Sequence, residues 1–207
     1  MRLPTHRIGV NVIDSTNSID EFYYAFKSSL IGAPLELRLA QDAVEWRRGG
    51  VSGRAPYRGI RRIRLSFRPM TMQNHRFLAE IWPADGAKLQ IISTSWKSMF
   101  DHEPLDAAYA AFITELSRRI GAAGGQTSFE CGSPALIYWP GVVIVAGASL
   151  GIAALALRAV QVGALAGAAF IAAFLALFLW QAANFFRRNR PGTYRPEMVP
   201  PRVLPEG

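Results

Sequence analysis

The sequence has little cysteine: Cys131 is the only one in 207 residues. An internal disulfide is therefore excluded, which fits a chain that is kept in a reducing compartment. Cys131 lies just before a long apolar run and has no histidine near it in the sequence. We interpret it as an inert thiol rather than a nucleophile, because a reactive cysteine needs a neighbouring base or cation.

Catalytic and metal-binding motifs are also lacking. The three histidines, His6, His75 and His102, are too far apart in the sequence to match the spacing of a metal site. The chain contains no G-x-S-x-G motif, no phosphate-binding P-loop and no dinucleotide fingerprint. We therefore predict no catalytic residue, no metal and no cofactor, and interpret the protein as non-enzymatic.

Charge is missing from two apolar runs near the C-terminus, Leu136–Leu157 and Val162–Trp180. Each run reaches the roughly 20 residues that a helix needs to cross the hydrocarbon layer of a bilayer. Only the short segment 158–161 separates them, which is too little to fold by itself. The pattern predicts a transmembrane helical hairpin whose two flanking segments lie on the same side of the membrane.

The distribution of arginine predicts which side that is. Arginines follow the second run at positions 187, 188, 190 and 195, whereas Arg158 alone lies at the tip of the hairpin. Excess Lys and Arg marks the cytoplasmic side of a membrane protein. We therefore expect an integral inner (cytoplasmic) membrane protein with both termini in the cytoplasm. The first residues have no apolar core, so no signal peptide is expected.

Each apolar run carries two glycines at the spacing that lets helices pack closely. Gly147 and Gly151 form one G-x-x-x-G pair, and Gly163 and Gly167 form the other. Small residues four apart lie on one helix face and allow two backbones to approach. The other arm of the hairpin is the favoured partner. A second copy of the chain, giving a homo-oligomer, or a helix of another protein remains the alternative.

The residues before the hairpin predict a mixed α and β domain. The segment 18–31 has a capping box, Ser18 with Glu21, and apolar residues at helical spacing, and so predicts a helix whose aromatic face packs on its own domain or lies on the membrane. After it the period changes to two, which predicts short antiparallel strands with one solvated face. The alternating rows are Leu35–Leu39, Val44–Trp46, Ile63–Phe67, Phe77–Ile81 and Leu89–Ile91.

A second amphipathic helix is predicted after the strands. Apolar residues from Leu105 to Ile120 form one stripe at helical spacing, and Gly121 is expected to end the helix. A meander of strands followed by one amphipathic helix is the arrangement of an α+β domain with an antiparallel sheet or barrel.

The segment Val44–Phe67 resembles the pleckstrin-homology-like (PH-like) domains of bacterial membrane proteins. It contains a strand, VEWRRGG, and then APYRGIRRIRLSF, in which Tyr57, Ile60 and Ile63 match the short aromatic-x-x-Ile strand that leads into the next one. The resemblance covers about 35–121 and implies a PH-like fold. In many such proteins the hairpin precedes the domain, whereas here it follows, and a generic small α+β domain is the rival assignment.

The strongest chemical signal is a concentration of arginine. Nine arginines lie between Trp46 and Arg76, with no Asp or Glu among them. Arginine binds phosphate and carboxylate groups in bidentate fashion. Eight of them are our candidate residues for binding anionic lipid or a protein partner: Arg47, Arg48, Arg54, Arg58, Arg61, Arg62, Arg64 and Arg68.

These arginines allow several interpretations. Next to a cytoplasmic leaflet they would bind anionic lipid headgroups, each basic group gaining about 1 kcal/mol. An acidic protein surface is weighed equally with lipid. Specific recognition of a phosphoinositide-type lipid ranks behind both. A solvated face that protects a sheet edge from aggregation is the structural alternative. No nucleic acid is predicted, because no nucleic-acid-binding module is present.

The C-terminal segment, from Arg187 onward, is rich in proline and arginine. It is interpreted either as a disordered tail or as a strap that docks through apolar residues such as Tyr194 and Val203. The predicted order is an N-terminal segment with a short helix (1–33), a PH-like cytoplasmic domain (34–134), a transmembrane hairpin (135–183) and a cytoplasmic tail (184–207). We expect a membrane-surface binding or scaffolding protein, with an accessory or assembly subunit of a larger inner-membrane complex as the alternative.

Overall fold

The computed structural model describes residues 22–29, 31–69, 75–98 and 101–205. It divides into two compact units. The folded domain comprises Met1–Cys131 together with Thr193–Gly207, and the hairpin comprises Gly132–Gly192. The protein is therefore α+β, and its polar and apolar parts are separate units.

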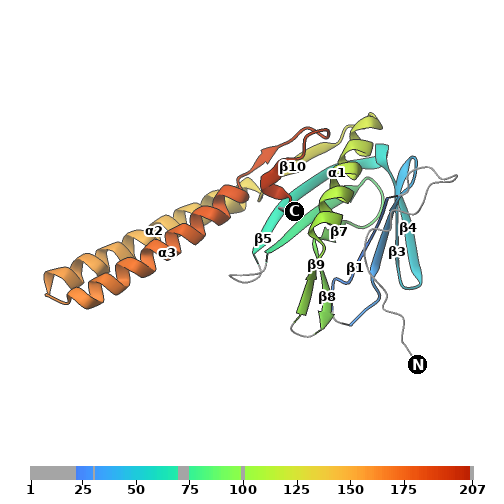
Figure 1. Cartoon of the computed structure of the whole chain (residues 1–207). Coiled ribbons are helices and arrows are strands. Elements are labelled where there is room, and N and C mark those ends of the chain that lie inside the picture. Colours follow the sequence, from blue (N-terminus) through green and yellow to red (C-terminus); the bar gives the residue numbers. More distant parts are fainter. Residues whose placement is uncertain (1–21, 30, 70–74, 99–100, 206–207) are drawn as a thin grey trace, which may run out of the picture. The chain divides into compact units, whose positions relative to one another are not determined.

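Two sheets form the frame of the folded domain (Figure 1). The first sheet has the strand order β1-β2-β3-β4, with β1 Phe22–Phe26, β2 Leu35–Leu39, β3 Ala43–Arg48 and β4 Val51–Pro56. The second has the order β11-β10-β5-β6-β7, with β5 Ile60–Pro69, β6 His75–Pro83, β7 Leu89–Ile92, β10 Ser128–Cys131 and β11 Gly192–Thr193. The consecutive strands pair antiparallel, whereas β10 pairs in parallel with β5.

Smaller elements complete the folded domain. Strands β8 (Thr94–Ser98) and β9 (Asp101–Pro104) form a separate antiparallel pair, which leads into helix α1 (Asp106–Ala122). Two short 3₁₀ helices, η1 (Tyr57–Gly59) and η2 (Pro201–Val203), lie before β5 and near the C-terminus.

The core lies between the inner faces of the two sheets and helix α1. Alternate residues of the strands are buried there, and the predicted rows in β2, β5, β6 and β7 are confirmed. From α1 the buried stripe includes Tyr109, Phe112, Leu116 and Ile120, as its spacing predicts. The helix continues one residue past Gly121 to Ala122, and the left-handed backbone falls instead on Gly124, with φ of 70°.

The predicted helix over 18–31 is wrong where the structure describes it, because Phe22–Phe26 is strand β1. Every residue of β1 pairs with one of Leu35–Leu39, and Tyr24 and Phe26 alternate into the core. The Tyr24 hydroxyl donates to the carbonyl of Ile92 at 2.6 Å. Tertiary pairing thus overrides a helical spacing that the same aromatic residues also satisfy. Residues 18–21 and Leu30 lie outside the described residues.

The hairpin consists of α2 (Ala135–Gln161) and α3 (Leu165–Arg188), which run side by side (Figure 1). Both helices are long and apolar enough to span a membrane, as the sequence predicts. The turn lies at 162–164 rather than at 158–161, since nothing breaks the helix before Gly163, whose φ is 75°. Left-handed backbone of this kind favours glycine, because it has no side chain to clash.

The two glycine pairs do not lie at the contact between α2 and α3. A Cβ atom added at Gly147, Gly151, Gly163 or Gly167 would meet no atom within 4 Å. The prediction that the opposite arm packs against them is therefore wrong, and packing against a helix of another chain stays a prediction. Close approach occurs instead at Gly132, where a Cβ atom would lie 2.3 Å from the carbonyl oxygen of Arg190.

The C-terminal segment docks on the folded domain as a strap, which decides between the two interpretations of the tail. Tyr194 and Val203 are buried. The Tyr194 amide donates to the carbonyl of Phe129 at 3.1 Å, and its ring stacks edge-on against that of Phe129. The Tyr194 hydroxyl lies 3.2 Å from the Ser117 hydroxyl of α1. The strap and β10 therefore belong to the folded domain rather than to separate segments.

Candidate functional site

The eight candidate arginines do not share one surface. They divide between the first sheet, the 3₁₀ helix η1 and strand β5 of the second sheet. Arg47 and Arg48 lie in β3, Arg54 in β4, Arg58 in η1, and Arg61, Arg62, Arg64 and Arg68 in β5. Proximity in the sequence therefore does not translate into a single basic face.

On the outer face of the first sheet, Arg47 and Arg54 are paired with acids from neighbouring strands and from the turn between β2 and β3. Arg47 donates to Glu36 at 2.7 Å, and this hydrogen bond raises the pKa of the Arg47 guanidinium. Arg54 bonds Asp42 at 2.5 Å and lies 3.4 Å from Glu45. These pairs are exposed to solvent, so each is expected to stabilise the fold only slightly. The positive charge of both arginines is offset by their acidic partners.

The second sheet has a different outer face. Alternation along β5 directs Ile63 and Leu65 into the core and leaves Arg62 and Arg64 on the other side. In the strand register, Trp82 of β6 lies opposite Arg62. Cross-strand neighbours on one face are close enough to interact, which brings the ring and the guanidinium together.

Three cations surround the Trp82 ring. The guanidinium carbons of Arg62 and Arg64 lie 4.3 and 5.6 Å from the ring centroid, and Lys88 Nζ lies 5.5 Å from it. Each lies within the range of a cation–π interaction, which stabilises a cation by about 0.5–1 kcal/mol at an exposed site. We call these four residues, Arg62, Arg64, Trp82 and Lys88, the Trp82 cluster.

Two carboxylates hold the cations of the Trp82 cluster in place. Glu130 of β10 accepts a hydrogen bond of 2.9 Å from Arg64 Nε and lies 4.0 Å from Arg62. Glu80 accepts from Lys88 at 2.7 Å and from Gln90 at 3.2 Å. Burial alone would raise the pKa of Glu80, but these hydrogen bonds outweigh it and lower the pKa. Three cations and two carboxylates leave one positive charge in excess.

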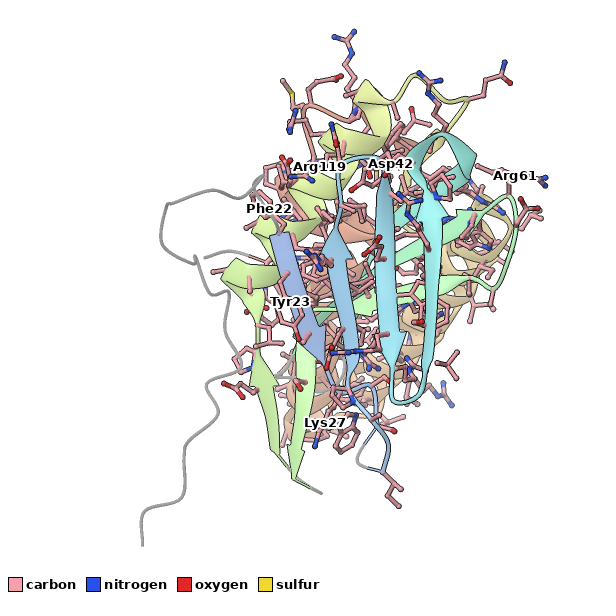
Figure 2. The ribbon with its side chains drawn as sticks, turned by 90° about the vertical axis from the view of Figure 1, so that its right-hand side faces the viewer. Phe22, Tyr23, Lys27, Asp42, Arg61 and Arg119 are labelled. Carbon is pink, nitrogen blue, oxygen red and sulfur yellow. The ribbon has the colours of Figure 1, made fainter. Side chains whose placement is uncertain are left out.

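In the described residues, none of the remaining candidates is among the cations at the Trp82 ring. Arg61 is exposed at the edge of the domain (Figure 2). Arg68 lies opposite Arg76 in the strand register, and burial together with the Arg68 charge lowers the pKa of Arg76. Arg58 donates through Nε to the carbonyl of Ala123 at 2.9 Å. Arg48 is exposed at the end of β3.

Trp82, Lys88 and Glu130 were not among the candidate residues predicted from the sequence. Trp82 and Glu80 have the same parity in β6, opposite to the buried Phe77–Ile81 row, and this signal could have placed them on the outer face. Glu130 could not be found in this way. It reaches Arg64 only because β10 pairs in parallel with β5 across 66 residues of sequence.

Cys131 is buried, and Arg202 of the strap donates to its sulfur at 3.1 Å. Among the residues that the structure describes, no group of three His, Cys, Asp or Glu side chains could hold a metal ion. The Trp82 cluster brings cations and an aromatic ring together, and guanidinium and ammonium groups are the side-chain groups that pair with anions.

Comparison with known proteins found no match: no family model, no curated protein and no solved structure corresponds to this chain. Its function is therefore argued from the geometry of the domain and the hairpin.

Proposed function

We propose that this chain is a non-enzymatic integral membrane protein whose folded domain binds anionic lipid headgroups at the membrane surface. The Trp82 cluster is the observation that carries the proposal. Tryptophan is favoured at the boundary between lipid and water, and Lys and Arg near an anionic leaflet gain about 1 kcal/mol each. The cluster combines both kinds of residue on one sheet face.

The connection between the two units supports the same proposal. Strand β10 carries Glu130, the partner of Arg64, and ends at Cys131, and α2 begins at Ala135. Strand β10, which pairs with β5 beside the Trp82 cluster, is thus joined to the candidate membrane helix α2 by only three residues.

The fold and orientation belong to the proposal as well. The meander β1–β7 followed by α1 supports a PH-like assignment, to which this chain adds the β8–β9 pair and the parallel strand β10. The arginines after α3 support a cytoplasmic location for both termini. A membrane-impermeant maleimide tests this orientation in an Ala87→Cys variant. Labelling of position 87 in intact cells would contradict it, and labelling only after lysis is expected.

The lipid contact can be measured with a fluorescent probe on a single cysteine. Ala87 is exposed and adjacent to Lys88, whereas Ser52 is exposed in β4 of the first sheet. Each position is changed to cysteine in a Cys131→Ser background, labelled with an environment-sensitive dye, and reconstituted as the full chain in vesicles. We expect a blue shift at position 87 in anionic vesicles but not in neutral ones, and no shift at position 52.

Matched variants assign that shift to the Trp82 cluster. The change Arg62→Gln should reduce it, and added salt should reduce it too, because screening weakens exposed charge interactions. Arg47→Gln removes the same charge from the first sheet and should leave the shift unchanged. Equal shifts in neutral and anionic vesicles would contradict the proposal.

The alternative function, an accessory subunit of a larger membrane complex, stays a prediction. It is addressed by co-purification of the tagged full chain in mild detergent, where stoichiometric partners would favour it.

A further inference from the structure

An open pocket of about 740 Å³ lies at one end of the folded domain. It is formed by the turn between β2 and β3, by η1 and by the C-terminal end of α1, and its lining includes Asp42, Tyr57, Arg58, Arg118, Arg119 and Ala122. Figure 2 shows Asp42 and Arg119 at this same end of the domain. The volume is within the range of small-molecule sites, roughly 300–1,000 Å³.

The guanidinium groups of the pocket are held in place by contacts with the fold. Arg119 donates through Nη1 to the carbonyls of Leu39 and Ala40, at 2.9 and 3.1 Å, and through Nε to Glu115 at 2.6 Å. Arg118 makes two hydrogen bonds of 2.7 Å to the same Glu115 carboxylate. A cation that is fixed before a ligand arrives loses less conformational entropy on binding.

Arg58 of η1 is anchored to the C-terminal end of α1. Its Nε donates to the carbonyl of Ala123 at 2.9 Å, and its two terminal nitrogens have no hydrogen-bond partner among the residues that the structure describes. Gly125 permits this contact between η1 and the end of α1, since a Cβ atom there would lie 3.0 Å from the carbonyl oxygen of Arg58. Within the described part of the chain, the remaining donors of Arg58 are therefore available to a ligand.

The charges around the pocket leave a positive excess. Four guanidiniums, those of Arg118, Arg119, Arg58 and Arg54, face three carboxylates, those of Glu115, Asp42 and Glu45. Tyr57 stays neutral, because burial raises the pKa of its hydroxyl, which donates to the carbonyl of Ala40 at 2.9 Å. Ala122 and the Tyr57 ring give the pocket an apolar wall beside its cations.

We propose that this pocket binds the phosphate group of a phosphomonoester, with Arg58 and Arg118 as its ligands and the apolar wall against its organic part. Arginine pairs with phosphate oxygens in bidentate fashion, and these two arginines line the pocket from different elements, η1 and α1. A soluble organic phosphate and a lipid headgroup with a terminal phosphate share this chemistry. The site uses none of the four residues of the Trp82 cluster, and the proposal does not depend on the proposed lipid contact.

Calorimetric titration of the full chain in detergent micelles tests the proposal with a soluble probe, glycerol 3-phosphate. Ala122 is exposed, so Ala122→Glu places a negative charge in the pocket without disturbing the core. Ala122→Gln is its control of equal size. We expect Ala122→Glu and Arg58→Gln each to weaken binding about tenfold or more, since each removes or opposes a charge-assisted hydrogen bond.

A second titration uses nanodiscs that contain the chain and either phosphatidic acid, a phosphomonoester, or phosphatidylglycerol, a phosphodiester. The readout is chemical protection of Arg58 from a guanidinium-modifying reagent. Protection by phosphatidic acid and not by phosphatidylglycerol would support the site with a lipid as its ligand. Binding of glycerol 3-phosphate that Ala122→Glu weakens and Ala122→Gln does not would support it with a soluble ligand.

Two outcomes would overturn the proposal. One is that neither probe binds. The other is that Arg48→Gln, an exposed arginine of β3 outside the pocket, weakens binding as much as Arg58→Gln, which would indicate nonspecific attraction. Equal melting temperatures of all variants exclude loss of the fold as the cause. Either failure would leave the proposed function of the Trp82 cluster standing, because that function is measured at position 87.

Discussion

The two sheets of the folded domain each carry a tryptophan opposite a different partner. In the first sheet Trp46 lies opposite Gly53, and a Cβ atom at position 53 would lie 2.5 Å from the indole. In the second sheet Trp82 lies opposite Arg62, whose guanidinium is over its ring. The same residue type thus covers backbone in one sheet and holds cations in the other, and the cross-strand neighbour decides which.

The ion pairs of the two sheets differ in the same way. On the first sheet the Arg47 side chain is 66% exposed, so its pair with Glu36 is well solvated. On the second sheet the side chains of Arg64 and Glu130 are 15% and 26% exposed. Because solvent screens an exposed pair and weakens it, the second sheet should depend on its ion pairs and the first should not.

The largest effect is expected where the Trp46 ring covers the backbone. Gly53→Ala places a methyl group where the indole lies, so the ring or the strand must move, at a cost of about 2–3 kcal/mol in the free energy of unfolding. Denaturation of the full chain in detergent, followed by circular dichroism, measures this cost. Gly50→Ala is the control, since a Cβ atom at position 50 would meet nothing within 4 Å. Equal stability of the two variants would show that Trp46 does not pack on Gly53.

A smaller effect is expected from the ion pairs. Glu130→Gln leaves Arg64 without its carboxylate in a partly buried place and should cost about 1.5 kcal/mol, as for a lost hydrogen bond to a charged group. Glu36→Gln, the matched change on the first sheet, should have almost no effect. The same denaturation experiment compares them. A larger loss for Glu36→Gln would reverse the difference between the two sheets.

The smallest effect is a dependence on pH. The pKa of Glu80 is lowered in the folded domain, so its carboxylate adds stability above its unfolded pKa, and this stability is lost as pH falls through the folded pKa. Glu80→Gln should therefore lower stability by less than about 1 kcal/mol at neutral pH, and the two proteins should converge in acid. Melting temperatures measured from pH 7 to about 3 report the difference. A difference that does not depend on pH would indicate that Glu80 acts through packing alone.

Much of the fold could be predicted because burial imposes a period. Ile63 and Leu65 alternate in β5, and Tyr109 and Phe112 follow helical spacing in α1. The segment at Phe22–Phe26 failed because its aromatic residues fit both periods, and only pairing with β2 distinguishes them. Two of the four residues of the Trp82 cluster, Arg62 and Arg64, were predicted from the sequence, whereas Trp82 and Lys88 were not.

By itself, the sequence determined that two apolar segments form long helices and that alternating strands precede them, because local composition and periodicity decide which residues avoid water. Only the tertiary structure decided which basic side chains have acidic partners. Glu36, Glu80 and Glu130 reach Arg47, Lys88 and Arg64 from neighbouring strands, so a run of arginines without acids became two different surfaces. It also brought the strap onto α1 and β10, because Tyr194 is buried there by residues far from it in the sequence.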